Sequence, residues 1–247
     1  MSRPVAPFTT RVLAATRAES LAYLRRGESV LITILVPVIV LLFISWKGDE
    51  LMGETPDPDR VVPSVLALAL IASAFVSLAI TVGFDRKYGV LRRLGVTPLG
   101  HRGLMCAKIL ATLGLVLLQT VVVLGTARVA LGWHFSGDPL ALGLFVLVGT
   151  VAFGALGLLL AGAFSAELTL ALANAIFVVL ALFGGVIALE SPAASTAGKI
   201  AAMLPSAALG EGLRAACTGA FDGQALGVLA AWGVGASILG ARSFRWD

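Results

Sequence analysis

The chain has 247 residues, of which 58% are hydrophobic and 13% charged, and its mean hydropathy is +0.98. A soluble domain of this length could not cover its surface with so few charges, and the same composition excludes intrinsic disorder. The net charge of +4 is divided among short basic stretches beside apolar runs, which argues against nucleic acid as a partner. The composition therefore indicates a protein of the lipid bilayer.

The first 28 residues precede the first long apolar run. They lack an apolar core of the length that a signal peptide needs, so we expect them to stay on the mature protein. As a helix, the segment places Leu13, Leu21 and Leu24 on one arc, which Arg17 interrupts. We expect residues 1–28 to form a helix at the membrane interface, with a disordered tail as the alternative.

Six apolar runs follow, each of roughly the 20 residues that a helix needs to cross a hydrocarbon core about 30 Å thick. The runs are continuously apolar, whereas strands of a membrane barrel alternate in polarity. The predicted spans are residues 29–46, 61–84, 104–131, 140–164, 168–189 and 224–241. We therefore predict an all-α polytopic membrane protein, with one six-helix transmembrane domain over residues 29–247.

Few polar side chains interrupt these spans. Lys108 and Arg128 lie near opposite ends of the third span, where both are expected to reach the membrane interface. Pro37 leaves the carbonyl of Thr33 without its amide partner and forms either a hinge or a fixed bend. The deeper amides, Gln119 and Asn174, either bond neighbouring helices or contact a transported molecule. The span interiors hold no aspartate, glutamate or histidine, which disfavours ion-coupled transport.

Small residues at four-residue spacing predict close helix contacts in the fourth and sixth spans. These ladders are Gly157, Ala161 and Ser165, and Gly227, Ala231 and Gly235. Cys106 and Cys217 are expected at opposite membrane faces, too far apart to pair, and neither has metal-ligand spacing. We expect no metal site.

The distribution of basic residues predicts the orientation. With six spans, 13 of the 18 lysines and arginines lie on the side of the two termini and five on the other side. By the positive-inside rule both termini face the cytoplasm. Arginine outnumbers lysine 14 to 4, and together with abundant alanine this is typical of a high-GC bacterium. We therefore expect a multi-pass protein of a bacterial inner membrane.

The sequence holds no ATP-hydrolysing motif. Its one Gly-Lys pair, Gly198–Lys199, is followed by Ile200 and lacks the spacing of a P-loop. The chain is therefore not expected to be an enzyme by itself, nor to bind a cofactor.

The inner loop 83–102 mixes charge with an apolar stripe. Val90, Leu91 and Leu94 fall on one face of a predicted short helix, with basic residues around them. Thr97 and Pro98 are expected as the N-cap and first turn of the next helix. Exposed apolar residues framed by arginines would suit docking in a partner's groove.

Two stretches resemble the permease subunits of ABC-2 type exporters, in particular the daunorubicin/doxorubicin resistance-like branch. Residues 84–99, Phe-Asp-Arg-Lys-Tyr-Gly-Val-Leu-Arg-Arg-Leu-Gly-Val-Thr-Pro-Leu, followed by Lys108, are similar to that family's loop between its second and third spans. Residues 203–214 are similar to its Leu-Pro motif before the last span. The chain departs from the pattern at Lys87, where the family more often has Glu.

The resemblance implies a cytoplasmic coupling helix seated on a separate ATPase subunit, an N-terminal connecting helix, and outer re-entrant helices over residues 193–219. The coupling residues that it implies are Arg86, Lys87, Tyr88, Val90, Leu91, Arg92, Arg93 and Leu94. A complex would contain two ATPase subunits, which bind ATP and Mg, and a second copy of this chain or a related six-span permease. Candidate residues of the cargo pathway are Phe75, Gln119, Asn174 and Phe177.

We therefore expect the permease subunit of an ATP-driven exporter of hydrophobic or amphipathic molecules, such as drugs or lipids. An ion-coupled secondary transporter, a membrane scaffold without transport, and an ABC-2 exporter of polysaccharide or haem-related cargo are the alternatives. Membrane lipids are expected partners, and nucleic acid is not.

Overall fold

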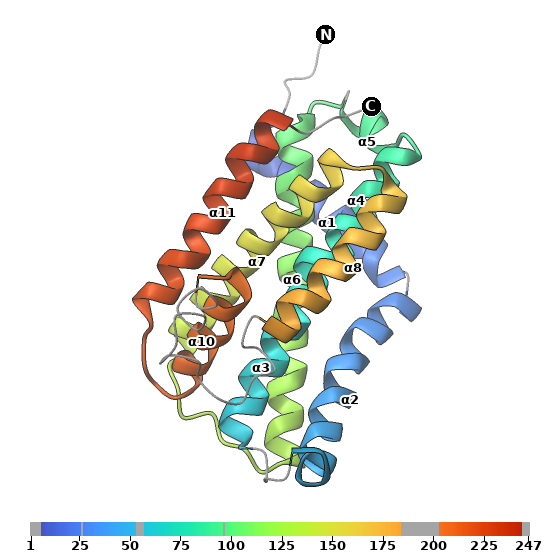
Figure 1. Ribbon diagram of the computed structural model, residues 1–247. Helices are drawn as coiled ribbons and strands as arrows, with labels where there is room; N and C mark the ends of the chain where they lie inside the picture. The colour runs from blue at the N-terminus through green and yellow to red at the C-terminus, as the bar shows by residue number, and fades with distance from the viewer. Residues whose placement is uncertain (1–5, 26, 53–56, 96, 184–202, 244–247) are drawn as a thin grey trace.

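The computed structural model describes residues 6–25, 27–52, 57–95, 97–183 and 203–243. Throughout this part of the chain the regular secondary structure is helical, as the composition predicts. The long helices run side by side between two ends of the molecule (Figure 1). Within the described residues, five of them are long and apolar enough to cross a membrane.

The N-terminal region forms α1 (Phe8–Arg25) and α2 (Gly27–Met52). α1 confirms the helix expected there, and it packs against α6. The three leucines of its apolar arc face outward and are exposed. α2 contains a candidate span, Val30–Gly48, where residues 29–46 were predicted, and only 11% of its apolar window is buried. Both helices therefore present apolar surface to the outside of the bundle.

The second span is one continuous rod of three segments: α3 (Pro58–Ile71), the π-helix η1 (Ala72–Ser77) and α4 (Leu78–Lys87). Its start is capped by Asp57, whose carboxylate accepts a hydrogen bond from the amide of Asp59 at 3.0 Å. The π turn was not predicted, because an apolar run has the same hydropathy in an α- or a π-helix. Such turns are frequent at functional sites.

Three helices continue the chain: α5 (Val90–Gly95), α6 (Gly100–Ala130) and α7 (Pro139–Ala163). α7 starts as α3 does, with an aspartate cap followed by proline, since Asp138 accepts from the amide of Leu140 at 2.8 Å. α6 and α7 correspond to the third and fourth predicted spans.

The last helices are α8 (Ala166–Phe183), α10 (Pro205–Cys217) and α11 (Gly223–Ser243). α11 corresponds to the sixth predicted span and is long and apolar enough to cross a membrane. α8 lies in the fifth, but residues 184–189 of that span fall outside the described residues, so the count of six stays a prediction. α10 is a short helix before the last span, and the remainder of the predicted outer segment, residues 193–202, is also outside the described part.

α3 and α7 form the centre of the bundle, with about two-thirds of each span buried. α10 packs against α3, α7 and α11 instead of lying free. Its Gly212 faces the ring of Phe145 so closely that a Cβ there would lie 2.1 Å from a ring carbon. The apolar segment before the last span is therefore part of the core.

Small residues allow close helix contacts, but only one of the two predicted ladders makes them. A Cβ at Gly157 in α7 would lie 2.8 Å from the carbonyl oxygen of Phe75, so this glycine lets η1 approach. In α11 the glycine that meets α7 is Gly233, where a Cβ would lie 3.1 Å from the Cα of Ala152. The predicted ladder of α11, which begins at Gly227, does not face α7 because it lies on another side of the helix.

Candidate functional site

A groove of about 440 Å³ opens between α2, the α3–η1 rod, α6 and α8. Its walls are formed by apolar side chains of four helices, with a few hydroxyl groups and one amide. The lining residues are Ile32, Thr33, Val36, Pro37, Val40, Val65, Leu68, Ala69, Ala72, Ser73, Ser77, Gln119, Phe177 and Ala181. None of these side chains is ionisable.

Gln119 is the polar centre of this groove, and it is 2% exposed. Its Nε2 donates to the carbonyl oxygen of Thr33 at 2.8 Å, and its Oε1 accepts from the hydroxyl of Ser73 at 2.9 Å. The Thr33 carbonyl is the acceptor that Pro37 cannot serve, because proline has no amide hydrogen. Gln119 thus joins α6 to α2 and to η1, which confirms the interpretation of this amide as an interhelical bond.

The four predicted pathway residues do not share one site. Gln119 and Phe177 both line the groove. Phe75 instead lines a second, wholly apolar groove of about 310 Å³ between η1, α7, α8 and α11. Asn174 is exposed on α8, and among the described residues its amide donates to the carbonyl of Leu170 one turn earlier. The interhelical bond expected of Asn174 is therefore not made within the described chain.

The segment predicted as one coupling helix is divided into two by a tight turn. Arg86 and Lys87 end α4, and Gly89 adopts a φ of +70°, which favours glycine, before α5 begins. Arg86 donates to the carbonyl of Gly162 at 2.9 Å and also bonds that of Phe164, so it caps the end of α7.

The expectation that the apolar stripe of α5 is exposed is wrong. Leu91 is fully buried, where it clusters with Leu78 and Leu104, and Leu94 packs against the same cluster. The stripe is covered because the turn at Gly89 folds α5 back onto the bundle. Apolar residues on one face of a helix predict that this face is buried, but they do not show whether the same chain or a partner covers it.

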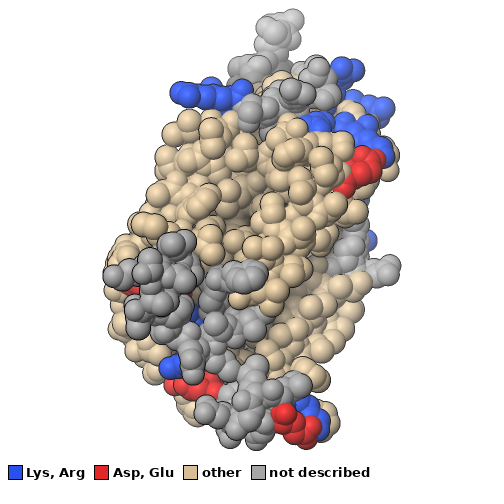
Figure 2. All heavy atoms as spheres, viewed as in Figure 1, with Lys and Arg blue, Asp and Glu red and all other residues tan. Residues whose placement is uncertain are grey.

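The outward side of this end of the molecule is basic and aromatic. Tyr88 is 66% exposed, and Arg92, Arg93 and Arg102 are exposed beside it. Figure 2 shows lysine and arginine side chains gathered over this end and a broad band without charge below it. Lys87 forms an ion pair with Glu167 at the start of α8, so the lysine that departs from the family pattern is held by this chain.

The link between α5 and α6 also differs from the prediction. Thr97 was expected to cap α6, but α6 begins at Gly100. The Thr97 hydroxyl instead donates to the carbonyl of Leu94 at 2.6 Å and so bonds the end of α5. The hydroxyl could serve either helix, because only a short turn separates them.

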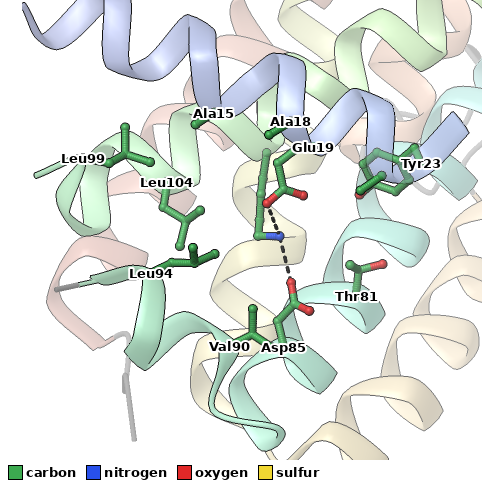
Figure 3. A pocket seen from close by; sticks show the side chains of 12 residues that line it. Ala15, Ala18, Glu19, Tyr23, Thr81, Asp85, Val90, Leu94, Leu99 and Leu104 are labelled. Atoms are coloured by element: carbon green, nitrogen blue, oxygen red, sulfur yellow. Dashed lines mark hydrogen bonds and ion pairs between the residues drawn. The ribbon is translucent and has the colours of Figure 1, made fainter. Parts of the chain in front are cut away.

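Lys108 is not an interfacial lysine. Its side chain is 2% exposed, and its Nζ lies 2.8 Å from a carboxylate oxygen of Asp85 and 3.0 Å from one of Glu19. The three groups come from α6, α4 and α1 and line a cavity of about 310 Å³, in which Figure 3 shows Glu19 and Asp85 between Leu94 on one side and Tyr23 on the other. The expected exit to the interface is closed because α1 covers this side of α6.

Sequence reasoning did not foresee this charged cluster. Lys108 and Asp85 each lie near the end of a predicted span, and either position alone is typical of a residue that reaches water. The signal that could have found the cluster is Glu19, an acidic residue in a helix expected to lie across those ends. Without the packing of α1 on α6, no spacing in the sequence connects residues 19, 85 and 108.

Short polar links hold the end of the molecule that bears α10. Trp133 donates to a carboxylate oxygen of Asp59 at 2.5 Å and so connects the start of α3 with the segment after α6. The expected pair of Glu211 and Arg214 is present at 2.7 Å. Burial raises the pKa of the Cys217 thiol to about 12.

A bundle of long apolar helices around an uncharged groove, with charge confined to its ends, defines a polytopic membrane protein. Residues 44–242 match the model of a family described as ABC-2 family transporter protein. Because the match covers most of the chain, the protein belongs to this family of membrane transport components, which is not itself catalytic. A comparison with curated proteins finds no match.

Proposed function

We propose that this chain is the permease subunit of an ATP-driven exporter that moves hydrophobic or amphipathic molecules, drugs or lipids, out of a bacterial cytoplasm. The groove between α2, α3–η1, α6 and α8 carries this proposal. Its volume of about 440 Å³ suits a small molecule, and its lining has no ionisable side chain. A charged solute would lose its hydration there without compensation. The sequence likeness to the daunorubicin/doxorubicin resistance-like branch agrees with such a cargo.

The energy would come from a separate chain. ABC-2 permeases normally work with ABC ATPase subunits. We place the docking site for these subunits at the basic end, where Tyr88, Arg92 and Arg93 project outward. Because Leu91 fixes α5 to the core, a push on this end would be passed to α4 and α6 as a rigid-body movement. ATP and Mg would be bound by the ATPase pair.

A second permease, identical or related, would complete the pathway. The exposed face of α2 is apolar, and Asn174 on α8 is exposed. If this part of α8 lies within the membrane, lipid would offer the Asn174 amide no hydrogen bond. A partner helix against α2 and α8 would cover both. The groove, which α2 and α8 border, would then lie at the interface between the two permease subunits.

The orientation follows from charge. The end that bears α5 carries the exposed arginines 92, 93 and 102 and also the end of α11 with Arg242. By the positive-inside rule this end faces the cytoplasm. Both termini would then be cytoplasmic, and α10 would lie toward the outer face.

Two tryptophan variants on α2, one that fills the groove and one that does not, test the cargo site. Val36 and Ile39 lie on the same helix and are 51% and 53% exposed, but only Val36 lines the groove. We would reconstitute the permease with its ATPase in liposomes and measure ATP-dependent transport of a hydrophobic dye. Val36→Trp should reduce transport at least about fivefold by filling the groove, and Ile39→Trp should not. Equal transport by both variants would remove the groove from the pathway.

The same liposomes separate the proposed exporter from an ion-coupled transporter. An ATP-driven permease transports only with ATP and is indifferent to a protonophore. Transport that stops with a protonophore and ignores ATP would refute the proposal, as would a permease that never copurifies with an ATPase.

A further inference from the structure

The cluster around Lys108 has one ammonium group for two carboxylates. Glu19 and Asp85 are 19% and 21% exposed, so all three groups are largely withdrawn from water. Lys108 contacts one oxygen of each carboxylate. The formal charges of the three groups sum to −1, so the two carboxylates repel each other although each accepts its own hydrogen bond from the ammonium.

The two carboxylates are attached to Lys108 in different ways. Asp85 lies 23 residues before Lys108, and the chain between them folds into a hairpin of α4, α5 and α6. The buried leucines at positions 78, 91 and 104 hold this hairpin together. Glu19 comes from α1, 89 residues away in the sequence. The pair of Lys108 and Asp85 is therefore internal to one unit, and Glu19 joins a separate helix to that unit.

Glu19 is one of several groups that hold this part of α1 in place, since α1 packs along α6 and Tyr23, one turn after Glu19, also lines the cavity. On the side of the cluster, Ala15, Ala18 and Ala22 of α1 border the cavity, and Val90 and Leu94 lie across it. Figure 3 shows α1 above this space, with the Glu19 side chain reaching down from it, and the Glu19 carboxylate accepts a hydrogen bond from Lys108. Among the described residues of α1, Val12 is the buried side chain, and it lies about two turns before Glu19. The cavity leaves room for α1 to move relative to α5.

We propose that Glu19 is a releasable latch that holds α1 on the bundle, and that Asp85 sets how tightly the latch closes. When α1 leaves, Lys108 keeps a carboxylate partner, so the movement does not leave a bare ammonium inside the protein. When α1 is docked, Asp85 weakens the hold by repelling Glu19 and by offsetting part of the positive charge that attracts Glu19. Lys108 and Asp85 are positioning residues in this device, and Glu19 is its moving part.

The latch concerns this chain alone and does not depend on the proposed function. Only its use rests on that proposal: α1 and α5 border the same cavity, so an ATPase that moves α5 would change the space into which α1 docks.

Cysteine labelling of the purified permease in lipid nanodiscs measures the release of α1. Cys106 is exposed and is replaced by Ser, while Cys217 is buried and is kept as a reporter of global folding. A cysteine at position 15 faces the cavity and reacts with a polar maleimide faster when α1 undocks. The labelling rate of each of the two cysteines is read by mass spectrometry.

The latch predicts opposite effects for the two carboxylates. Glu19→Gln should speed labelling at position 15 by about tenfold, since it removes a charged hydrogen bond. Asp85→Asn should slow that labelling by about threefold or more, since Lys108 then belongs to Glu19 alone. The matched control is Glu211→Gln, which removes a carboxylate from the ion pair on α10 and should leave the rate unchanged.

A purely structural cluster gives a different pattern. If both carboxylates merely held the helices together, Asp85→Asn would speed labelling at position 15 as Glu19→Gln does, and that result would overturn the latch. An unchanged rate in Glu19→Gln would overturn it too. Labelling of Cys217 in either variant would show that the whole protein has loosened. In that case the conservative variant Glu19→Asp replaces Glu19→Gln. The latch then requires that Glu19→Asp speeds labelling at position 15 while Cys217 stays unlabelled.

Discussion

Gln119 Nε2 lies 2.8 Å from the carbonyl oxygen of Thr33, the acceptor that Pro37 deprives of its backbone donor. A side chain of α6 thus takes the place of an amide in α2. The bond repairs a defect in one helix and at the same time fixes the distance between two helices at the wall of the groove.

This relationship predicts a coupled pair of substitutions. Gln119→Leu leaves the Thr33 carbonyl and the Ser73 hydroxyl without this partner and should lower the free energy of unfolding by about 2 kcal/mol. With Pro37→Ala the backbone supplies an amide at residue 37, so Gln119→Leu should cost about 1 kcal/mol less in that background. SDS titrations of the four proteins provide the measurement. Equal costs in both backgrounds would show that Pro37 and Gln119 act independently.

Substitutions at the basic end should separate an effect on folding from an effect on coupling to ATP hydrolysis. Leu91→Asp places a charge in a fully buried position and should prevent accumulation of folded protein. Arg92→Glu together with Arg93→Glu changes exposed residues only, so the permease should fold normally but lose cargo-stimulated ATP hydrolysis by about tenfold or more. Size-exclusion profiles and ATPase assays of the assembled complex report the two effects. Normal stimulation by the double arginine variant would place the docking surface elsewhere.

The contact between α7 and η1 predicts that one glycine is irreplaceable. Gly157→Ala puts a Cβ 2.8 Å from the carbonyl oxygen of Phe75, a backbone atom that cannot turn away. The substitution should destabilise the protein by about 1–3 kcal/mol. Gly125→Ala in α6 meets nothing within 4 Å and should be neutral or stabilising by up to about 1 kcal/mol. Thermal unfolding in detergent compares the two, and a similar melting temperature for both would contradict this packing.

The two thiols should differ sharply in reactivity. The pKa of Cys217 is raised to about 12 by burial, so at pH 8 its thiol is almost entirely protonated and shielded as well. Because the thiolate fraction grows as pH rises toward the pKa, labelling should stay negligible up to pH 9 unless the protein unfolds. Cys106 is exposed and should react. N-ethylmaleimide should therefore modify one thiol per native chain and two per chain in SDS, whereas two in the native state would place Cys217 at the surface.

Much of the bundle could be predicted because lipid solvation leaves a strong local signal. Each of spans one to four and six appears as a continuous apolar run, and its helix is found within a few residues of the expected bounds. The caps of α3 and α7 are also local, since an aspartate followed by proline serves the first turn whatever packs nearby.

The predictions that failed depended on which helix surfaces contact each other in the folded protein. Leu91 and Lys108 were read as outward residues, but both are buried because α5 folds back and α1 crosses α6. The π turn of η1 changes the facing of Ser73 and Phe75 without changing the apolar pattern. For Gln119 the sequence left open an interhelical bond or contact with a transported molecule. The structure shows the bond, whose partners depend on tertiary packing.

The six residues of η1 form a partition between two hollows of the bundle. Ala72, Ser73 and Ser77 border the groove that holds Gln119, and Phe75 borders the apolar groove beside Trp232. The same single turn of helix therefore lines both grooves, so a molecule bound in either one lies against the backbone segment that forms the wall of the other.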